Sequence, residues 1–184
     1  MSANAFTLGY SSKDRATHIS QLFSIDNYGD MSRCSVMQAL SGSAQLEFLS
    51  KKALDRILEI DSSKKALSSI VDLYSKKDFK GSYNVFRRLG LNKLHLVSEH
   101  SLPTSVCYGL LKADKAKQNE KFIRHILDDC IYVLCGITSE EDDLLSKAHL
   151  KQKMPKSWNG NLDKDATFAR YREVGIEVIK IKDL

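Results

Sequence analysis

Apolar residues recur at helical spacing through the first half of the chain. They stand three or four positions apart, which places them on one face of a helix. Residues 44–60 show this pattern most strongly, because lysine and arginine occupy the positions between the leucines and isoleucines. Helices are predicted over residues 12–23, 31–40, 44–60, 63–76 and 80–89, with a turn at 26–30 and a stop at Gly90.

The pattern changes after residue 92. Residues 93–98 alternate between apolar and polar side chains, as a half-buried strand does. Residues 131–135 form a continuous apolar run, which is typical of a central strand buried on both faces. Residues 176–181 alternate again. Further helices are predicted over residues 103–113, 117–129, 138–150 and 165–174, the last closed by Gly175.

These elements predict an α+β or α/β fold. The N-terminal half is rich in helix, and the C-terminal half holds a small mixed sheet of about three strands with helices against it. We expect a helical segment at 1–92 and a small α/β segment at 93–184, joined in one compact unit. A chain of 184 residues is long enough for that.

Composition narrows the class of protein. Apolar residues make up 42% and charged residues 28%, as in ordinary globular proteins. The longest uncharged apolar stretch, 130–137, is far shorter than the ~20 residues of a membrane helix. No secretory signal is recognisable, and no two of the four cysteines form a C-x-x-C pair. We therefore expect free thiols, a cytoplasmic location and no membrane partner.

The positive charge is concentrated in one segment. The chain carries a net charge of +5, yet residues 51–93 alone hold 11 basic and 5 acidic residues. A basic helical face favours a polyanion such as DNA or RNA, although it is also a common solvated surface. The candidate nucleic-acid contacts in this segment are Lys51, Lys52, Arg56, Lys64, Lys65, Arg87 and Arg88.

The strongest candidate for chemistry is the step from Ser98 to Pro103, where a predicted strand ends and a helix begins. Side chains at strand ends are held rigidly and exposed by the adjoining loop. Glu99 offers a carboxylate for a metal ion, and His100 offers a general base. The alternative is a helix start with a structural histidine.

The sequence Glu99-His100-Ser101-Leu102-Pro103 resembles the first motif of the HNH-type nucleases of phages and restriction systems. The resemblance implies that His100 takes a proton from the attacking water and that Glu99 helps to bind a divalent metal such as Mg²⁺. It also implies a hairpin followed by one helix. Asp128 and Asp129, just before the central strand, are further candidate metal ligands.

A second basic region follows residue 150. Lysines stand beside the one tryptophan of the chain, and two arginines follow on a short predicted helix. Such residues neutralise phosphates and stack on bases, although the tryptophan could instead anchor the loop to the core. The candidate contacts here are Lys153, Lys156, Trp158, Arg170 and Arg172.

The sequence lacks the P-loop, the dinucleotide-binding glycines, the G-x-S-x-G elbow and H-E-x-x-H. These absences argue against P-loop nucleotide hydrolysis, dinucleotide redox chemistry, serine hydrolysis and standard zinc proteolysis. The favoured hypothesis is a nucleic-acid-directed protein, specifically a small metal-dependent endonuclease of a phage or restriction system. The alternatives are a non-enzymatic nucleic-acid-binding protein and an interaction or immunity-type protein with a protein partner.

Overall fold

A four-stranded mixed sheet lies at the centre of the fold. The computed structural model describes residues 12–24, 30–41, 45–60, 65–75, 85–131, 133–163 and 167–184. The strand order is β2 (Leu96–His100), β3 (Val133–Thr138), β1 (Gln45–Ser50), β4 (Val178–Lys180). β1 and β3 run parallel, and the two outer pairs run antiparallel. The predicted α+β class with a mixed sheet is confirmed.

Strand β1 corrects one prediction, because residues 45–50 were expected to be helical. The helix α3 (Lys51–Ile60) begins only after the strand. The register of β1 against β3 shifts between Leu46 and Phe48. This bulge puts Leu46 and Leu49 into the same buried cluster, so a strand shows the three-residue spacing of a helix. Because β1 pairs with β3 and β4, the sheet joins the 1–92 and 93–184 segments.

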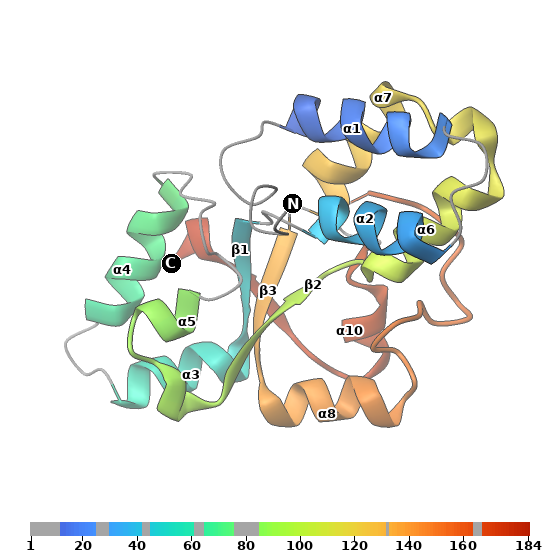
Figure 1. Cartoon of the computed structure of the whole chain (residues 1–184). Helices are drawn as coiled ribbons and strands as arrows, with labels where there is room; N and C mark the ends of the chain where they lie inside the picture. The colour runs from blue at the N-terminus through green and yellow to red at the C-terminus, as the bar shows by residue number, and fades with distance from the viewer. Residues whose placement is uncertain are drawn as a thin grey trace.

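The two faces of the sheet are covered by different helices (Figure 1). α3, α4 (Lys65–Ser75) and α5 (Val85–Arg88) share a buried cluster with Leu134 of β3. α8 (Ser139–Lys147) and α10 (Ala169–Glu173) share another with its alternate residues Val133, Cys135 and Ile137. Strand β3 is thus buried on both faces, as its apolar run predicts.

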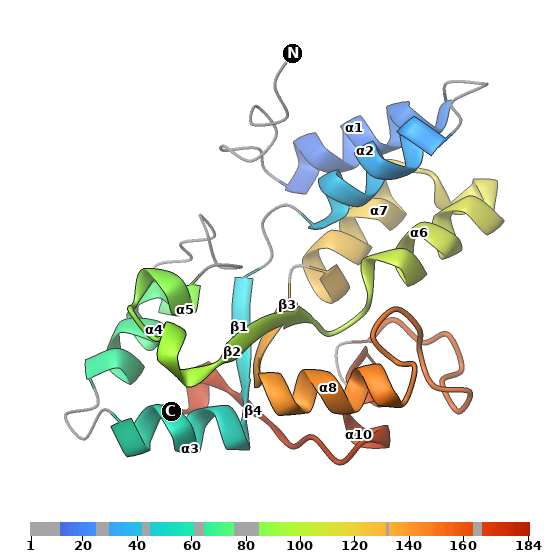
Figure 2. The same cartoon turned by 60° about the horizontal axis from the view of Figure 1, so that its bottom comes forward.

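A group of helices packs beyond the end of β2 (Figure 2). It consists of α1 (Ser12–Ser24), α2 (Asp30–Ser41), α6 (Thr104–Ala113) and α7 (Glu120–His125). α7 continues as a π-helical turn, Ile126–Ile131. The helices predicted at 12–23, 31–40, 103–113 and 117–129 are confirmed, although the last starts three residues later and widens after His125.

The remaining boundaries follow local backbone chemistry. Gly90 and Gly175 adopt left-handed φ angles of 71° and 73° and end α5 and α10, as predicted. The helix predicted at 63–76 spans 65–75, and that at 80–89 is described only from residue 85. The predicted turn at 26–30 lies largely outside the described residues. Short 3-10 turns occupy Asn92–Leu94, Lys115–Lys117 and Ile181–Asp183.

The cysteines and the lengths of the helices bear on two expectations from composition. Cys107 and Cys135 are buried thiols that form no disulfide, as expected. Burial raises the pKa of the Cys135 thiol well above its ordinary value, and the nearby Glu141 carboxylate adds to this effect. Cys135 therefore stays protonated and acts as a core residue. Within the described ranges, no helix has the length and apolarity needed to cross a membrane.

Candidate functional site

Strand β2 delivers Glu99 and His100 to the wall of a surface pocket. The strand ends at His100, and Pro103 sets the start of α6 with a φ of −58°. The pocket has a volume of about 290 Å³. We call it the β2 pocket. It is lined by Glu99, His100, Pro103, Thr104 and Ser105, by Arg33 and Met37 of α2, and by Lys151 and Gln152.

The walls of the β2 pocket come from three distant parts of the chain. Ser105 at the start of α6 donates a hydrogen bond to the carbonyl of Gln152 at 2.9 Å, which ties α6 to the loop after α8. His100 is 8% exposed and therefore lies at the pocket wall with little contact with bulk water. The sequence placed Glu99 and His100 at a strand end correctly. It carried no signal that Arg33 would face them.

Arg170 links the end of β2 to the loop after α8. Its side chain is fully buried. Its Nε donates to the carbonyl of Ser101 at 3.2 Å, and Nη1 donates to those of Leu150 and Lys151 at 3.1 and 3.2 Å. Nη2 donates to Glu99 Oε1 at 2.8 Å and also contacts the His100 carbonyl. One guanidinium thus joins both walls of the β2 pocket.

This placement corrects the predicted role of Arg170 as a nucleic-acid contact. The guanidinium is fully buried and six protein oxygens accept hydrogen bonds from it, so it cannot contact a phosphate in solution. Burial lowers the pKa of Arg170, but the interactions with Tyr171 and Glu99 outweigh burial, so the pKa is raised above its ordinary value. Arg170 therefore stays cationic and fixes the Glu99 carboxylate.

Tyr171 supports the same corner of the sheet. Its hydroxyl donates to the His100 carbonyl at 3.2 Å, and the ring is fully buried. Burial raises the pKa of Tyr171 well above its ordinary value, so the hydroxyl remains a donor. Two adjacent residues of α10 thus bind the backbone at the end of β2.

The charges around the β2 pocket favour an anionic ligand. Arg33 is exposed on α2, and the Lys151 ammonium is half-exposed while it pairs with Asp142 at 2.6 Å. The one carboxylate among the lining side chains, Glu99, is 13% exposed and neutralised by Arg170. Arg33 therefore supplies the positive charge at the pocket, whereas the charge of Lys151 is balanced in large part by Asp142.

The described residues do not fit the predicted magnesium site. Mg²⁺ favours several oxygen ligands in near-octahedral geometry. Glu99 is bound by Arg170, and Asp128 pairs with Arg124 at 3.9 Å on the α7 side of the molecule. Across the described ranges, no three His, Cys, Asp or Glu side chains gather around one point. The Asp129 side chain lies outside what the structure describes.

The basic residues of segment 51–93 lie away from the β2 pocket. Figures 1 and 2 show α3, α4 and α5 near the start of β2 and α6 at its end. A five-residue strand separates them by roughly 16 Å. Arg56 is engaged by the Leu94 carbonyl at 3.2 Å and by Glu140 at 2.9 Å. Lys64 lies outside the described residues. Of the predicted contacts in this segment, Lys51, Lys52, Lys65, Arg87 and Arg88 are exposed.

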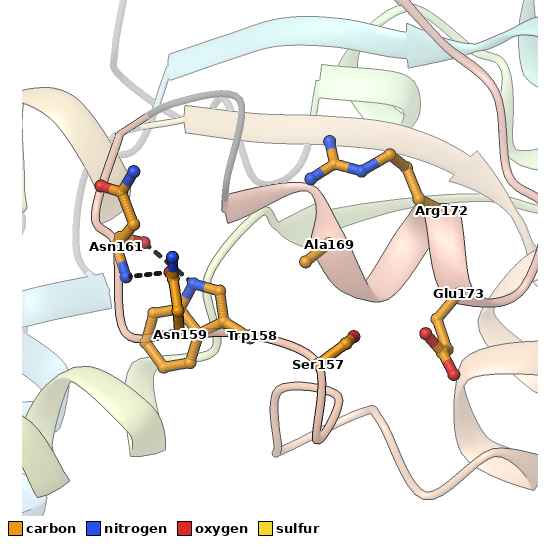
Figure 3. A pocket seen from close by; sticks show the side chains of 7 residues that line it. All are labelled: Ser157, Trp158, Asn159, Asn161, Ala169, Arg172 and Glu173. Atoms are coloured by element: carbon orange, nitrogen blue, oxygen red, sulfur yellow. Dashed lines mark hydrogen bonds between the residues drawn. The ribbon is translucent and has the colours of Figure 1, made fainter.

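The loop after α8 forms a second pocket against α10, with a volume of about 420 Å³. We call it the loop pocket. Trp158 lies on one side, Arg172 and Glu173 lie on the other, and Ala169 is between them (Figure 3). The structure thus brings the predicted residues Trp158 and Arg172 together. Lys153 and Lys156 are exposed on the same loop but do not line this pocket.

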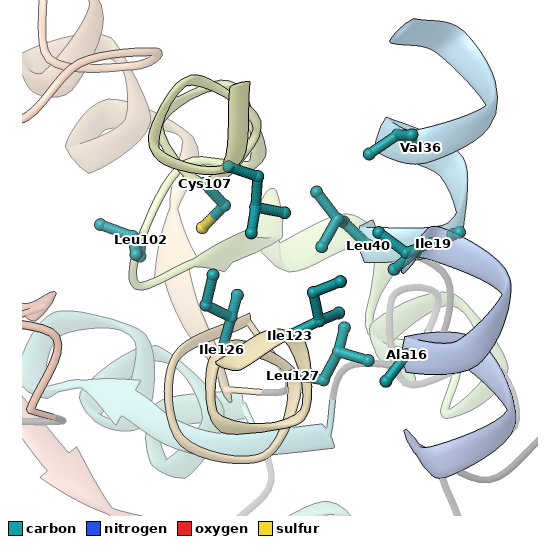
Figure 4. Close-up of a cluster of buried hydrophobic side chains, with 11 residues drawn as sticks. Ala16, Ile19, Val36, Leu40, Leu102, Cys107, Ile123, Ile126 and Leu127 are labelled. Atoms are coloured by element: carbon teal, nitrogen blue, oxygen red, sulfur yellow. The ribbon is translucent and has the colours of Figure 1, made fainter. Parts of the chain in front are cut away.

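A buried helical cluster supports both pockets. Leu102 and Cys107, which flank the α6 start, point into it with Ile126 of the π-helical turn (Figure 4). Trp158 packs at the edge of the same cluster. Trp158 therefore anchors the loop to the core, and its ring also lines the loop pocket.

Comparison with known proteins adds no further assignment. No protein-family model matches the chain, and no curated protein or solved structure is significantly similar to it.

Proposed function

We propose that the chain binds nucleic acid and cleaves a phosphodiester bond in the β2 pocket. The observation that carries this proposal is the meeting of His100 and Glu99 with Arg33 and Lys151 around one cavity. A histidine beside a fixed carboxylate supplies proton transfer, and two cations suit a phosphate group. The volume is near the lower end of the range of small-ligand sites, ~300–1,000 Å³, and suits one sugar-phosphate unit.

The residues divide the work of hydrolysis as follows. His100 takes the proton of the attacking water as the new P–O bond forms. The P–O bond to the departing sugar oxygen breaks, and that oxygen takes up a proton from solvent. Arg33 and Lys151 stabilise the extra negative charge on the phosphate oxygens, which is the largest requirement of phosphoryl transfer. Glu99, held in place by Arg170, accepts a hydrogen bond from the water or the histidine and orients it. The described side chains do not form a magnesium site, so no step is assigned to the metal. Its participation stays a prediction.

The test is cleavage of plasmid DNA and of structured RNA by the purified protein, each with Mg²⁺, Mn²⁺ or EDTA. His100→Asn keeps a polar side chain at this position but removes the imidazole base, and it is expected to reduce cleavage at least 100-fold. His125→Ala serves as the matched control, because His125 is an exposed histidine on α7 outside the pocket. Equal cleavage by wild type and His100→Asn would rule out the proposed role of His100.

A second candidate is nucleic-acid binding without cleavage. It is favoured by the exposed lysines and arginines of α3, α4 and α5. These helices lie near the start of β2 (Figure 1), whereas the β2 pocket is at its end. In that case a gel shift weakens steeply with salt, since phosphate neutralisation releases counterions. Charge removal at Lys52, Arg87 and Arg88 then weakens the shift, whereas His100→Asn leaves it unchanged.

A further inference from the structure

The loop pocket has the composition of a site for a planar ligand next to an anion. It is lined by the indole of Trp158, by Ser157 and the amides of Asn159 and Asn161, and by Arg172 and Glu173. An aromatic face stacks on a flat ring, and the Ser157 hydroxyl and the Asn159 amide match the edge of such a ring. The Asn161 amide is itself bound by Asp163, at 2.9 and 3.0 Å, and shapes the loop. The Arg172 guanidinium suits a phosphate.

Trp158 is held rigidly in this pocket. Its indole N–H donates to the Asn161 carbonyl at 2.9 Å, and its backbone N–H donates to the Pro155 carbonyl at 3.0 Å. Asn161 in turn donates its backbone N–H to Asn159 Oδ1 at 3.0 Å. The ring is half-buried at the edge of the helical cluster, so stacking on it costs little further side-chain entropy.

Helix α10 lies between the two pockets. Arg170 points from it toward Glu99, whereas Arg172, two residues later, lines the loop pocket. Residues two apart on a helix point in nearly opposite directions, which explains how one short helix serves both sites. The loop joins the two pockets as well. Lys151 and Gln152 line the β2 pocket, and the loop pocket is lined by Ser157, Trp158, Asn159 and Asn161.

We propose that the loop pocket binds an unpaired nucleobase of the strand whose backbone occupies the β2 pocket. The base stacks on Trp158, and Arg172 pairs with the phosphate next to that base. This inference rests on the proposed function, because it takes nucleic acid as the ligand. It adds that the preferred ligand is single-stranded or locally opened, since a paired base inside a duplex has no free face to stack on Trp158.

The fluorescence of Trp158 tests this directly, because Trp158 is the only tryptophan in the chain. The probes are a thymidine oligonucleotide, an abasic oligonucleotide of the same length, the corresponding duplex and thymidine monophosphate. We expect the thymidine strand to quench the fluorescence at low salt, and the abasic strand and duplex to leave it unchanged. Quenching by the monophosphate is expected only at concentrations at least 100-fold higher, because one nucleotide makes far fewer contacts.

Variants separate stacking from charge. Trp158→Leu is expected to weaken strand binding about tenfold and Trp158→Phe to retain most of it, as one stacked base predicts. Arg172→Gln, at an exposed position, is expected to weaken binding with no loss of fold. Lys182→Gln, which removes the same charge beside β4, is the control and leaves the quenching unchanged.

Three results would overturn the proposal: equal quenching by the abasic and thymidine strands, no quenching by a strand that is shifted in a gel, or equally strong quenching by the monophosphate. Cleavage tests the other site independently. His100→Asn is expected to lose cleavage and keep the quenching. Failure of the loop pocket is thus distinguishable from failure of the β2 pocket.

Discussion

The guanidinium of Arg170 lies 2.8 Å from the carboxylate of Glu99, although 71 residues separate them in the sequence. The Arg170 side chain is fully buried, and that of Glu99 is 13% exposed. The pair joins α10 to the end of β2 at the position where Glu99 and His100 enter the β2 pocket. The geometry of the candidate site therefore depends on a residue that lines neither pocket.

Removal of this guanidinium should destabilise the fold strongly. Arg170→Met leaves the Glu99 carboxylate and several backbone carbonyls without their donor, so the free energy of unfolding should fall by about 3–5 kcal/mol. Urea denaturation followed by circular dichroism measures this. Arg172→Met is the matched control on the same helix and should stay within about 0.5 kcal/mol of wild type, since Arg172 is exposed. Similar losses in both variants would contradict the role of Arg170.

Gly136 in β3 tolerates no side chain. A Cβ there would lie 2.7 Å from Leu49 Cδ2 and would also collide with the Phe86 ring. Gly136→Ala should therefore lower the free energy of unfolding by about 1–3 kcal/mol through overpacking. Gly109→Ala in α6 is the control, because a Cβ there meets nothing within 4 Å. That change should raise stability by ~0.5–1 kcal/mol, and thermal unfolding distinguishes the opposite signs.

His149 ends α8 in a conformation that suits glycine. Its φ is 57°, and the Leu150 N–H donates to the Leu145 carbonyl at 2.8 Å, as in a glycine-capped helix end. His149→Gly should raise the free energy of unfolding by ~1 kcal/mol, because it relieves the left-handed strain. His149→Ala keeps that strain and should bring no gain. A stability increase in the alanine variant, measured in urea, would refute this explanation.

The ion pair of Glu140 with Arg56 should be visible in an acid titration. The hydrogen bond from Arg56, at 2.9 Å, lowers the pKa of Glu140 from 4.5 to about 2. Its stabilising effect is complete above about pH 4.5 and is lost as the pH falls through 2. Carboxyl-carbon NMR measures the titration. Arg56→Met should return the pKa toward 4.5, and an unchanged value would show that Arg56 is not the cause.

Much of the candidate site could be predicted from local pattern. Glu99 and His100 do stand at a strand end, because alternation predicts a strand and Pro103 predicts the helix start. Trp158 and Arg172 do share a pocket. The position of Arg33 could not be predicted, because no local pattern indicates that an exposed arginine on α2 faces Glu99, 66 positions later in the chain.

The difference between Arg170 and Arg172 could not be predicted either. Both are arginines on one predicted helix, and both are expected on a surface that binds phosphate. A charged side chain enters the interior only where distant partners neutralise it. Those partners are Glu99 and backbone carbonyls on either side of the β2 pocket, so the burial of Arg170 is a property of the assembled fold.

The sequence by itself determined the features whose causes are local. Gly90 and Gly175 end helices because glycine adopts positive φ without strain, and the apolar run of β3 reports burial on both faces. Tertiary structure alone decided that residues 45–50 form a strand. Their apolar spacing fits a helix equally well, and the bulge at Leu46 and Phe48 has meaning only against the partner strand β3. Pairing between strands is non-local, so only the assembled sheet decides it.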